Sequence, residues 1–146
     1  MIKTKIYNYC NKPSAADIEH VVSFLFEHLE QYGDTKDDIE KAVNYALKAS
    51  NSFGGFVLEG LENGKTVSVV VVNQTGMKGY IPENILVYIA THKDSRGKGI
   101  GKQMMLKALE IANGNIALHV EPDNPARFLY EKIGFTNKYL EMRYIK

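Results

Sequence analysis

Hydrophobic and polar positions along this chain repeat with two different periods. From 3 to 9, apolar residues alternate with polar or charged ones, a pattern typical of a strand with one buried face. From 14 to 31, apolar residues return at helical spacing, with Ile18, Val21 and Leu25 on one face. The same two periods recur to the end of the chain and predict the order β-α-α-β-β-β-α-β-α-β. The expected strands are 3–9, 56–58, 67–72, 85–91, 116–120 and 139–145, and the expected helices are 14–31, 35–49, 99–112 and 125–133.

Capping and turn residues support these boundaries. Ser14 and Thr35 each precede a helical pattern and are followed three residues later by an aspartate, as in a helix-capping box. Gly33 ends the first helix, and Asn63-Gly64 between two β-rich runs is a strong hairpin signal. No repeat, low-complexity stretch or linker interrupts the pattern, which predicts a single domain over 1–146.

The stretch 96–101, Arg-Gly-Lys-Gly-Ile-Gly, lies between an expected strand and an expected helix. The first turn of a helix has unpaired backbone N–H groups and a positive dipole end. Glycines allow a phosphate to approach that backbone closely, and Arg96, Lys98 and Lys102 add positive charge. The stretch predicts a site for a phosphorylated cofactor, although a basic turn of purely structural importance has the same composition.

Two common phosphate motifs do not fit the spacing. A dinucleotide-binding fingerprint requires a glycine where Lys102 stands. A P-loop requires a glycine at Arg96 and a serine or threonine at Gln103. The spacing R-x-x-G-x-G fits instead, and here the chain resembles the GNAT superfamily of acyl-CoA-dependent N-acyltransferases, in which this turn holds the pyrophosphate of coenzyme A.

A second segment, 120–135, strengthens the resemblance. It is similar to the N-x-x-A-x-x-L-Y-E-K-x-G-F-like segment that follows the cofactor helix in GNAT enzymes, and its separation from the glycine turn also fits. The expected order of elements along the whole chain is the GNAT order as well. The residues that match in register are Ala126, Leu129, Tyr130, Glu131, Lys132, Gly134 and Phe135.

The resemblance implies both a fold and a reaction. The fold is an α/β (α+β) domain with a central mixed, mostly antiparallel sheet, whose fourth and fifth strands splay apart and whose faces carry helices. The reaction is transfer of an acetyl group from acetyl-CoA to a primary amine by direct attack, with Tyr130 protonating the thiolate; otherwise, Tyr130 is a packed aromatic residue. We expect the pantetheine arm to pair with the freed strand edge, where a backbone N–H polarises the thioester carbonyl. The expected coenzyme A contacts are Ile89, Ala90, Thr91, Arg96, Gly97, Lys98, Gly99, Ile100, Gly101, Lys102, Asn124 (or Asp123 in a longer register) and Lys132.

The chain departs from the family on the fourth strand, where many GNAT enzymes have a glutamate that takes the amine's proton. No carboxylate occurs in 84–93. The candidate bases are therefore Glu83, His92, His119, Glu121 or ordered water. His119 could equally be a structural histidine. The missing carboxylate also supports an alternative function, a non-catalytic CoA-binding sensor or scaffold module of the same fold.

The acceptor pocket is expected between the first two helices and the loop 73–82, with Glu27, Glu30, Tyr32 and Tyr80 as candidate contacts. Acidic residues there suit a cationic amine, but the same charges are common on solvated helix faces. The acceptor is expected to be a small-molecule or peptide amine. Its identity, the preferred acyl chain and the oligomeric state stay open, although many relatives form homodimers.

Composition narrows the class of protein further. A formal net charge of +1 over 146 residues gives no overall attraction to nucleic acid or to a membrane surface. Cys10 is the single cysteine, so an internal disulfide is excluded. No apolar window approaches the length of a membrane span, no signal peptide is evident, and no His, Cys and carboxylate set has metal-ligand spacing. We expect a cytoplasmic protein without a metal.

Overall fold

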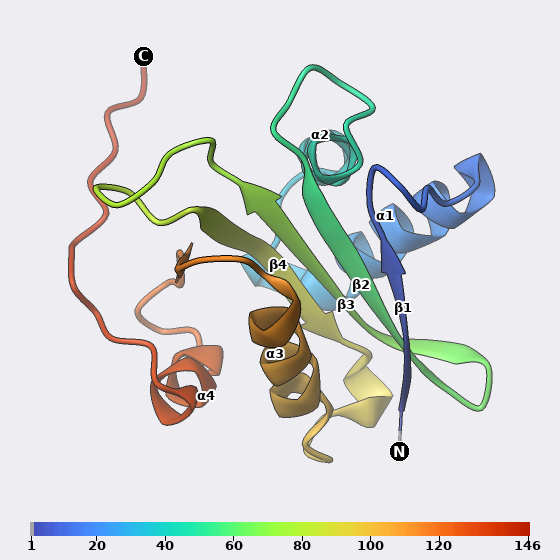
Figure 1. Cartoon of the computed structure of the whole chain (residues 1–146). Coiled ribbons are helices and arrows are strands. Elements are labelled where there is room, and N and C mark those ends of the chain that lie inside the picture. The colour runs from blue at the N-terminus through green and yellow to red at the C-terminus, as the bar shows by residue number, and fades with distance from the viewer. Residues whose placement is uncertain (1) are drawn as a thin grey trace.

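A mixed five-stranded sheet organises the molecule in the computed structural model, which describes residues 2–146. The strands lie in sequence order; consecutive pairs run antiparallel, except that the last two are parallel. The expected mixed, mostly antiparallel sheet is confirmed (Figure 1). The strands are β1 (Lys3–Tyr7), β2 (Gly55–Glu62), β3 (Lys65–Gln74), β4 (Asn84–Thr91) and β5 (Ile116–Leu118).

Helices cover both faces of this sheet. The first two α-helices pack on one face, and α3 crosses the other face with α4 beside it (Figure 1). Both expected N-caps are confirmed, because Ser14 and Thr35 each accept a hydrogen bond from the backbone N–H three residues on. The helices are α1 (Ala15–Leu29), α2 (Lys36–Ala46), α3 (Ile100–Ile111) and α4 (Ala126–Ile133), with 3₁₀ turns η1 (Glu30–Tyr32) and η2 (Lys93–Ser95).

The centre of the sheet separates two hydrophobic cores. In β3, Val69 and Val71 face the core under α1 and α2, whereas Val70 and Val72 face the core under α3. All four side chains are fully buried. A strand buried on both faces reads as a continuous apolar run, which explains the unbroken valines of this segment.

The hairpin between β2 and β3 has the predicted tight turn. Asn63 and Gly64 both have positive φ angles, 51° and 76°. Positive φ at both central residues is the condition for the two-residue turn that matches the twist of paired strands, and asparagine followed by glycine meets it at low cost. This prediction is confirmed.

The expected strand at 139–145 is wrong. The structure places no strand from 119 to the C-terminus, and the side chains of Tyr139 and Tyr144 are 78% and 88% exposed. Alternating apolar residues favour extended backbone, but a strand also requires a second strand to pair its N–H and C=O groups. No strand among residues 2–146 pairs with this segment, which runs along the outside of the domain (Figure 1). The fifth strand is also shorter than expected and ends at Leu118.

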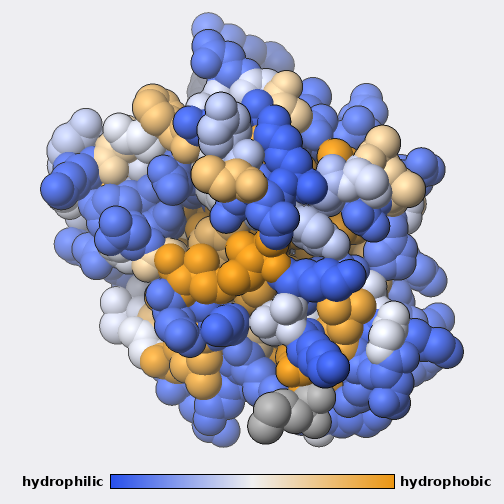
Figure 2. Space-filling view, turned by 45° about the vertical axis from the view of Figure 1, so that its right-hand side comes forward, coloured by the Kyte–Doolittle hydropathy of each residue, from blue (hydrophilic) through white to orange (hydrophobic). Residues whose placement is uncertain are grey.

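The surface is mainly hydrophilic. Figure 2 shows one face on which hydrophilic residues surround a central hydrophobic patch, with smaller hydrophobic areas around it. None of the helices within 2–146 combines the length and the apolar character that a membrane span requires.

Candidate active site

The sheet opens between β4 and β5. These strands pair only at Asn84–Ile116, Ile85–Ala117 and Leu86–Leu118. Immediately after these pairs, the register between β3 and β4 shifts. Val72 pairs with Leu86 and Val71 pairs with Tyr88, so β4 has one extra residue between these pairs. Such a bulge bends a strand and strengthens its twist. The expected splay of the fourth and fifth strands is therefore confirmed, and the rest of β4 has a free edge toward β5.

A cavity of about 710 Å³ lies at this opening. Its walls come from the end of β4, the glycine turn, the start of α4 and the end of α1. This volume is within the usual range of small-molecule sites, about 300–1,000 Å³. The structure brings eleven of the predicted site residues to its walls: Ile89, Ala90, Thr91, Arg96, Gly97, Gly99, Ile100, Gly101, Lys102, Asn124 and Tyr130. Lys98 and Lys132 lie outside it.

The glycine turn has the backbone of an anion site. Gly97 and Gly99 have φ angles of 79° and 77°, in the left-handed region that favours glycine. A Cβ added at either position would meet nothing within 4 Å, so the glycines are required by conformation and leave open space in front of the turn. Gly99 is the N-cap of α3, and the unpaired N–H groups of the first turn therefore lie at the cavity wall. A phosphate group fits this arrangement.

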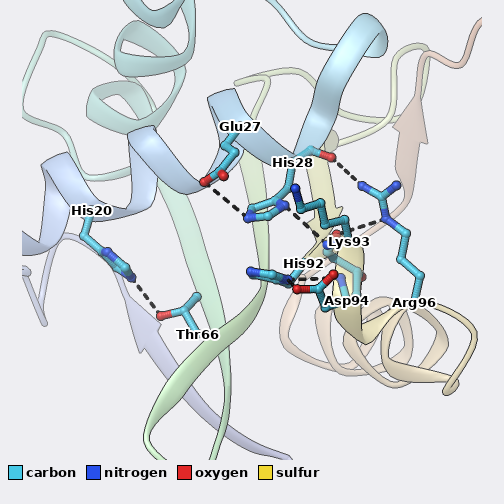
Figure 3. A network of polar contacts seen from close by, with 9 residues as sticks. His20, Glu27, His28, Thr66, His92, Lys93, Asp94 and Arg96 are labelled. Carbon is cyan, nitrogen blue, oxygen red and sulfur yellow. Dashed lines mark hydrogen bonds and ion pairs between the residues drawn. The ribbon is translucent and has the colours of Figure 1, made fainter.

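Arg96 ties two walls of the cavity together. Its Nη2 donates to the carbonyl oxygen of His28 at 2.8 Å (Figure 3). Its Nη1 donates to Glu30 Oε1 at 2.6 Å, and its Nε donates to the carbonyl oxygen of Thr91 at 3.2 Å. The side chain thus joins the end of α1 and η1 to the end of β4. Its charge stays at the cavity, and three of its five N–H donors are taken by protein acceptors.

The His28 residue, whose backbone carbonyl accepts from Arg96, is buried, with 4% of its surface exposed. Its Nδ1 accepts a hydrogen bond from the backbone N–H of Lys93 at 3.3 Å, which requires the neutral ring to carry its proton on Nε2, 3.5 Å from Glu27 Oε2. The ring also packs on His92, with centroids 4.2 Å apart (Figure 3). Burial, and then the neighbouring His92, lowers the pKa of His28 below its ordinary value.

Tyr130 lies where the main cavity meets a smaller cavity of about 60 Å³ and lines both. Only 8% of the residue is exposed, and burial raises the pKa of its hydroxyl to about 12. Its ring packs edge-on against Phe135, with centroids 6.1 Å apart. Tyr130 is therefore fixed in position and fully protonated at neutral pH.

Comparison with known proteins agrees with this geometry. The Acetyltransferase (GNAT) family model matches residues 19–135. The chain belongs to the GNAT acetyltransferase family. Membership implies acetyl-CoA-dependent acetyl transfer, and the predicted family and fold are both confirmed. No curated protein sequence gives a match.

Solved structures show how widely this fold is shared. A transcriptional regulator from Bacillus halodurans C-125 superposes with a TM-score of 0.72 at 17% identity, covering 100% of both chains. A ribosomal-protein-alanine N-acetyltransferase from Brucella melitensis biovar Abortus 2308 gives 0.66 at 18%, covering 100% of this chain and 99% of the other. A predicted acetyltransferase from Clostridium acetobutylicum, solved with acetyl-CoA, gives 0.67 at 19%, covering 98% and 96%. Identities this low establish the fold alone.

The structure also separates the two registers proposed for the GNAT pantetheine contact. Asn124 lines both cavities, whereas Asp123 lines neither. The Asn124 Oδ1 accepts a hydrogen bond from the backbone N–H of Ala126 at 2.9 Å, which holds the start of α4 beside the cavity. The structure thus places Asn124, and not Asp123, beside the cavity.

The candidate bases are dispersed. Glu83 Oε1 accepts from the backbone N–H of Asn115 at 2.7 Å; this bond and a second from Gly79 lower the pKa of the Glu83 carboxyl at the far end of β4. His92 accepts a hydrogen bond from the backbone N–H of Asp94 and is not among the residues that line the main cavity. Neither these residues nor Glu121 line a cavity, whereas His119 lines the smaller one.

On the expected acceptor side, Glu30 and Tyr32 line the main cavity, but Glu27 and Tyr80 line neither. Sequence reasoning missed a further contact of this wall: the Tyr88 hydroxyl donates to Asp34 Oδ2 at 2.5 Å. Burial, followed by this hydrogen bond, raises the pKa of Tyr88. The sequence offered one indication of this contact, the single tyrosine among the apolar residues in the middle of β4. Its partner could not be predicted, because Asp34 lies 54 residues away in the sequence.

His28 is a further residue of this region that the sequence pattern does not indicate. Its ring is buried because the end of α1 packs against the segment after β4, a contact that helical periodicity does not reveal. Within residues 2–146, no three His, Cys, Asp or Glu side chains gather as a metal site would require.

Proposed function

We propose that this chain transfers the acetyl group of acetyl-CoA to a primary amine by direct attack, with Tyr130 as the general acid. The observation that carries the proposal is the single cavity at which the glycine turn, the free edge of β4 and the Tyr130 side chain meet. A thioester held along that edge by its diphosphate end would reach the tyrosine.

Binding begins at the glycine turn. The N–H groups at the start of α3, together with the charge of Lys102, are suited to the diphosphate of coenzyme A. Arg96 contributes its charge while holding the wall. Open space in front of Gly97 and Gly99 lets the phosphate oxygens reach the backbone.

The free edge of β4 would then bind the pantetheine arm as an added strand. Ile89, Ala90 and Thr91 all line the cavity beyond the last β4–β5 pair. An N–H group of Ile89 or Ala90 directed at the thioester carbonyl would stabilise the negative charge that develops on its oxygen during attack.

Tyr130 would donate its proton to the leaving sulfur. With a pKa of about 12, the phenol is a weaker acid than a thiol in water, whose pKa is near 8.5. The sulfur leaves inside the protein, however, where desolvation raises the proton affinity of a thiolate as it does that of a phenolate. A hydrogen bond from Tyr130 therefore stabilises the departing sulfur most when the carbon–sulfur bond is breaking.

The second candidate, a non-catalytic CoA-binding module, is favoured by one observation. No carboxylate occurs in 84–93, the strand on which many family members carry their base. Such a module would bind coenzyme A equally well and turn over no acceptor.

Turnover separates the two functions. Thiol release from acetyl-CoA is measured across amines, amino acids and peptides, with calorimetry of coenzyme A binding in parallel. Tyr130→Phe should lower kcat by about 100-fold and leave coenzyme A affinity nearly unchanged, because general acids typically contribute 10²–10⁴-fold. Tyr139→Phe removes the same hydroxyl from an exposed side chain and is the matched control. Binding without turnover on every acceptor would support the module instead.

A further inference from the structure

We propose that the smaller cavity receives the attacking amine and that His119 is the catalytic base that takes its proton. The inference rests on the proposed acetyl transfer and adds to it the position of the acceptor and the path of the proton. It follows from which side chains the gap between β4 and β5 brings together.

The smaller cavity opens in the same gap as the main one. Its walls include Val87 and Ile89 from β4, and His119 and Val120, which directly follow β5. It shares Tyr130 and Ile89 with the main cavity. A group bound there would face the thioester carbon from the side opposite the glycine turn.

The size of the smaller cavity suits the end of an amine rather than a whole large molecule. Its volume is about 60 Å³, and a cavity needs about 10–15 Å³ to hold one water molecule. A primary aminomethyl group fits this space. The remainder of the acceptor would extend outward past His119, which is exposed.

The other titratable side chains that line this cavity with His119 are phenols. They are Tyr32 from η1, Tyr88 from β4 and Tyr130 from α4, and no carboxylate lines the cavity within the described chain. Phenols are ordinarily protonated at neutral pH, since their pKa lies near 10, so they donate rather than accept. Tyr88 is also occupied with Asp34. Among the side chains that line this cavity, the imidazole of His119 carries the ring nitrogen that can accept a proton from an amine.

The proposed step balances in atoms and charge. The nitrogen of the neutral amine attacks the thioester carbonyl carbon, a carbon–nitrogen bond forms, and the carbon–sulfur bond breaks. One proton leaves the nitrogen for the free ring nitrogen of His119, and one proton passes from the Tyr130 hydroxyl to the sulfur. The products are an amide and a thiol; water then returns the proton from His119 to Tyr130.

The test compares His119→Ala and His119→Gln with His20→Gln, an exposed histidine on α1 that lies outside both cavities. We expect both His119 variants to lower kcat by about 100-fold while coenzyme A affinity and circular dichroism stay unchanged. The His20 variant should keep full activity. Added imidazole should restore part of the rate to His119→Ala, because the small residue leaves room for it.

The pH profile provides a readout that a structural role would not change. In the wild type, log kcat/KM should rise with a slope near 2 at the acidic end of the profile, because the base and the amine must both be deprotonated for the reaction. The His119 variants should show a slope near 1 throughout. An unchanged slope and rate in both variants, beside an active wild type, would overturn the role of His119 alone. A wild type that binds coenzyme A but acetylates no amine would overturn the proposed function as well.

Discussion

Strands β2 and β3 pair over eight residue pairs, whereas β4 and β5 pair over three. In the first region, backbone groups are satisfied by neighbouring strands and the valines pack against helices on both faces. In the second, a bulge in β4 turns the strand away from its neighbour, leaving backbone groups free at a cavity wall. The same sheet thus provides stability where two strands pair along most of their length and a binding edge where pairing stops.

Truncation of matched core leucines tests this contrast most strongly. Leu58→Ala in β2, where the side chain is fully buried, should lower the free energy of unfolding by about 3 kcal/mol. Leu86→Ala, at the last pair before the gap, should cost less, because the side chain already borders the smaller cavity. Urea denaturation measures both. Equal losses would mean that the gap is packed as tightly as the paired region.

Two glycines with nearly the same conformation separate binding from stability. Gly64 in the β2–β3 hairpin and Gly99 at the start of α3 have φ angles of 76° and 77°, and a Cβ at either position would meet no neighbour. Gly64→Ala and Gly99→Ala should each lower the free energy of unfolding by about 1–2 kcal/mol, the cost of a left-handed residue with a Cβ. Only Gly99→Ala should also weaken coenzyme A binding, by about tenfold in calorimetry. A tenfold loss in both would show that affinity simply follows stability.

The buried histidine beside the gap predicts a pH dependence of stability. Because burial lowers the pKa of His28, the unfolded chain takes up a proton before the folded one as pH falls below about 6.5. Stability should therefore decrease with falling pH, by at most about 1.4 kcal/mol per pH unit from this group. Denaturation midpoints between pH 7.5 and 5.5 measure the slope, which should be shallower in His28→Gln. The same slope in both proteins would assign the effect to other groups.

Removing the ion pair between Arg96 and Glu30 at the cavity should change stability the least. The Arg96 and Glu30 side chains are 46% and 48% exposed, and partly exposed ion pairs typically contribute about 0.2–1 kcal/mol. A double-mutant cycle of Arg96→Ala and Glu30→Ala should give a coupling energy in that range. A coupling energy of zero would mean that the hydrogen bond between Tyr88 and Asp34 holds η1 beside the cavity without this ion pair.

Features of the fold that depend on neighbouring residues could be predicted from the sequence. The Ser14 cap, the Asn63-Gly64 turn and the glycine turn each consist of a few adjacent residues whose backbone preferences act locally. Features that depend on distant partners could not. The position of Arg96 next to the glycines predicted a contact with phosphate, but its guanidinium donates to Glu30, which lies 66 residues away in the sequence. The segment 139–145 has the period of a strand but lacks a partner strand.

The sequence by itself determined the order of elements as far as α4, the family and the glycine turn, because periodicity, capping and positive φ are properties of short stretches of chain. The tertiary structure decided which candidate base borders a cavity, which register places an asparagine at the site, and where the sheet opens. Those outcomes depend on packing between segments far apart in the chain, and the free energy of each contact is fixed only when both partners are in place.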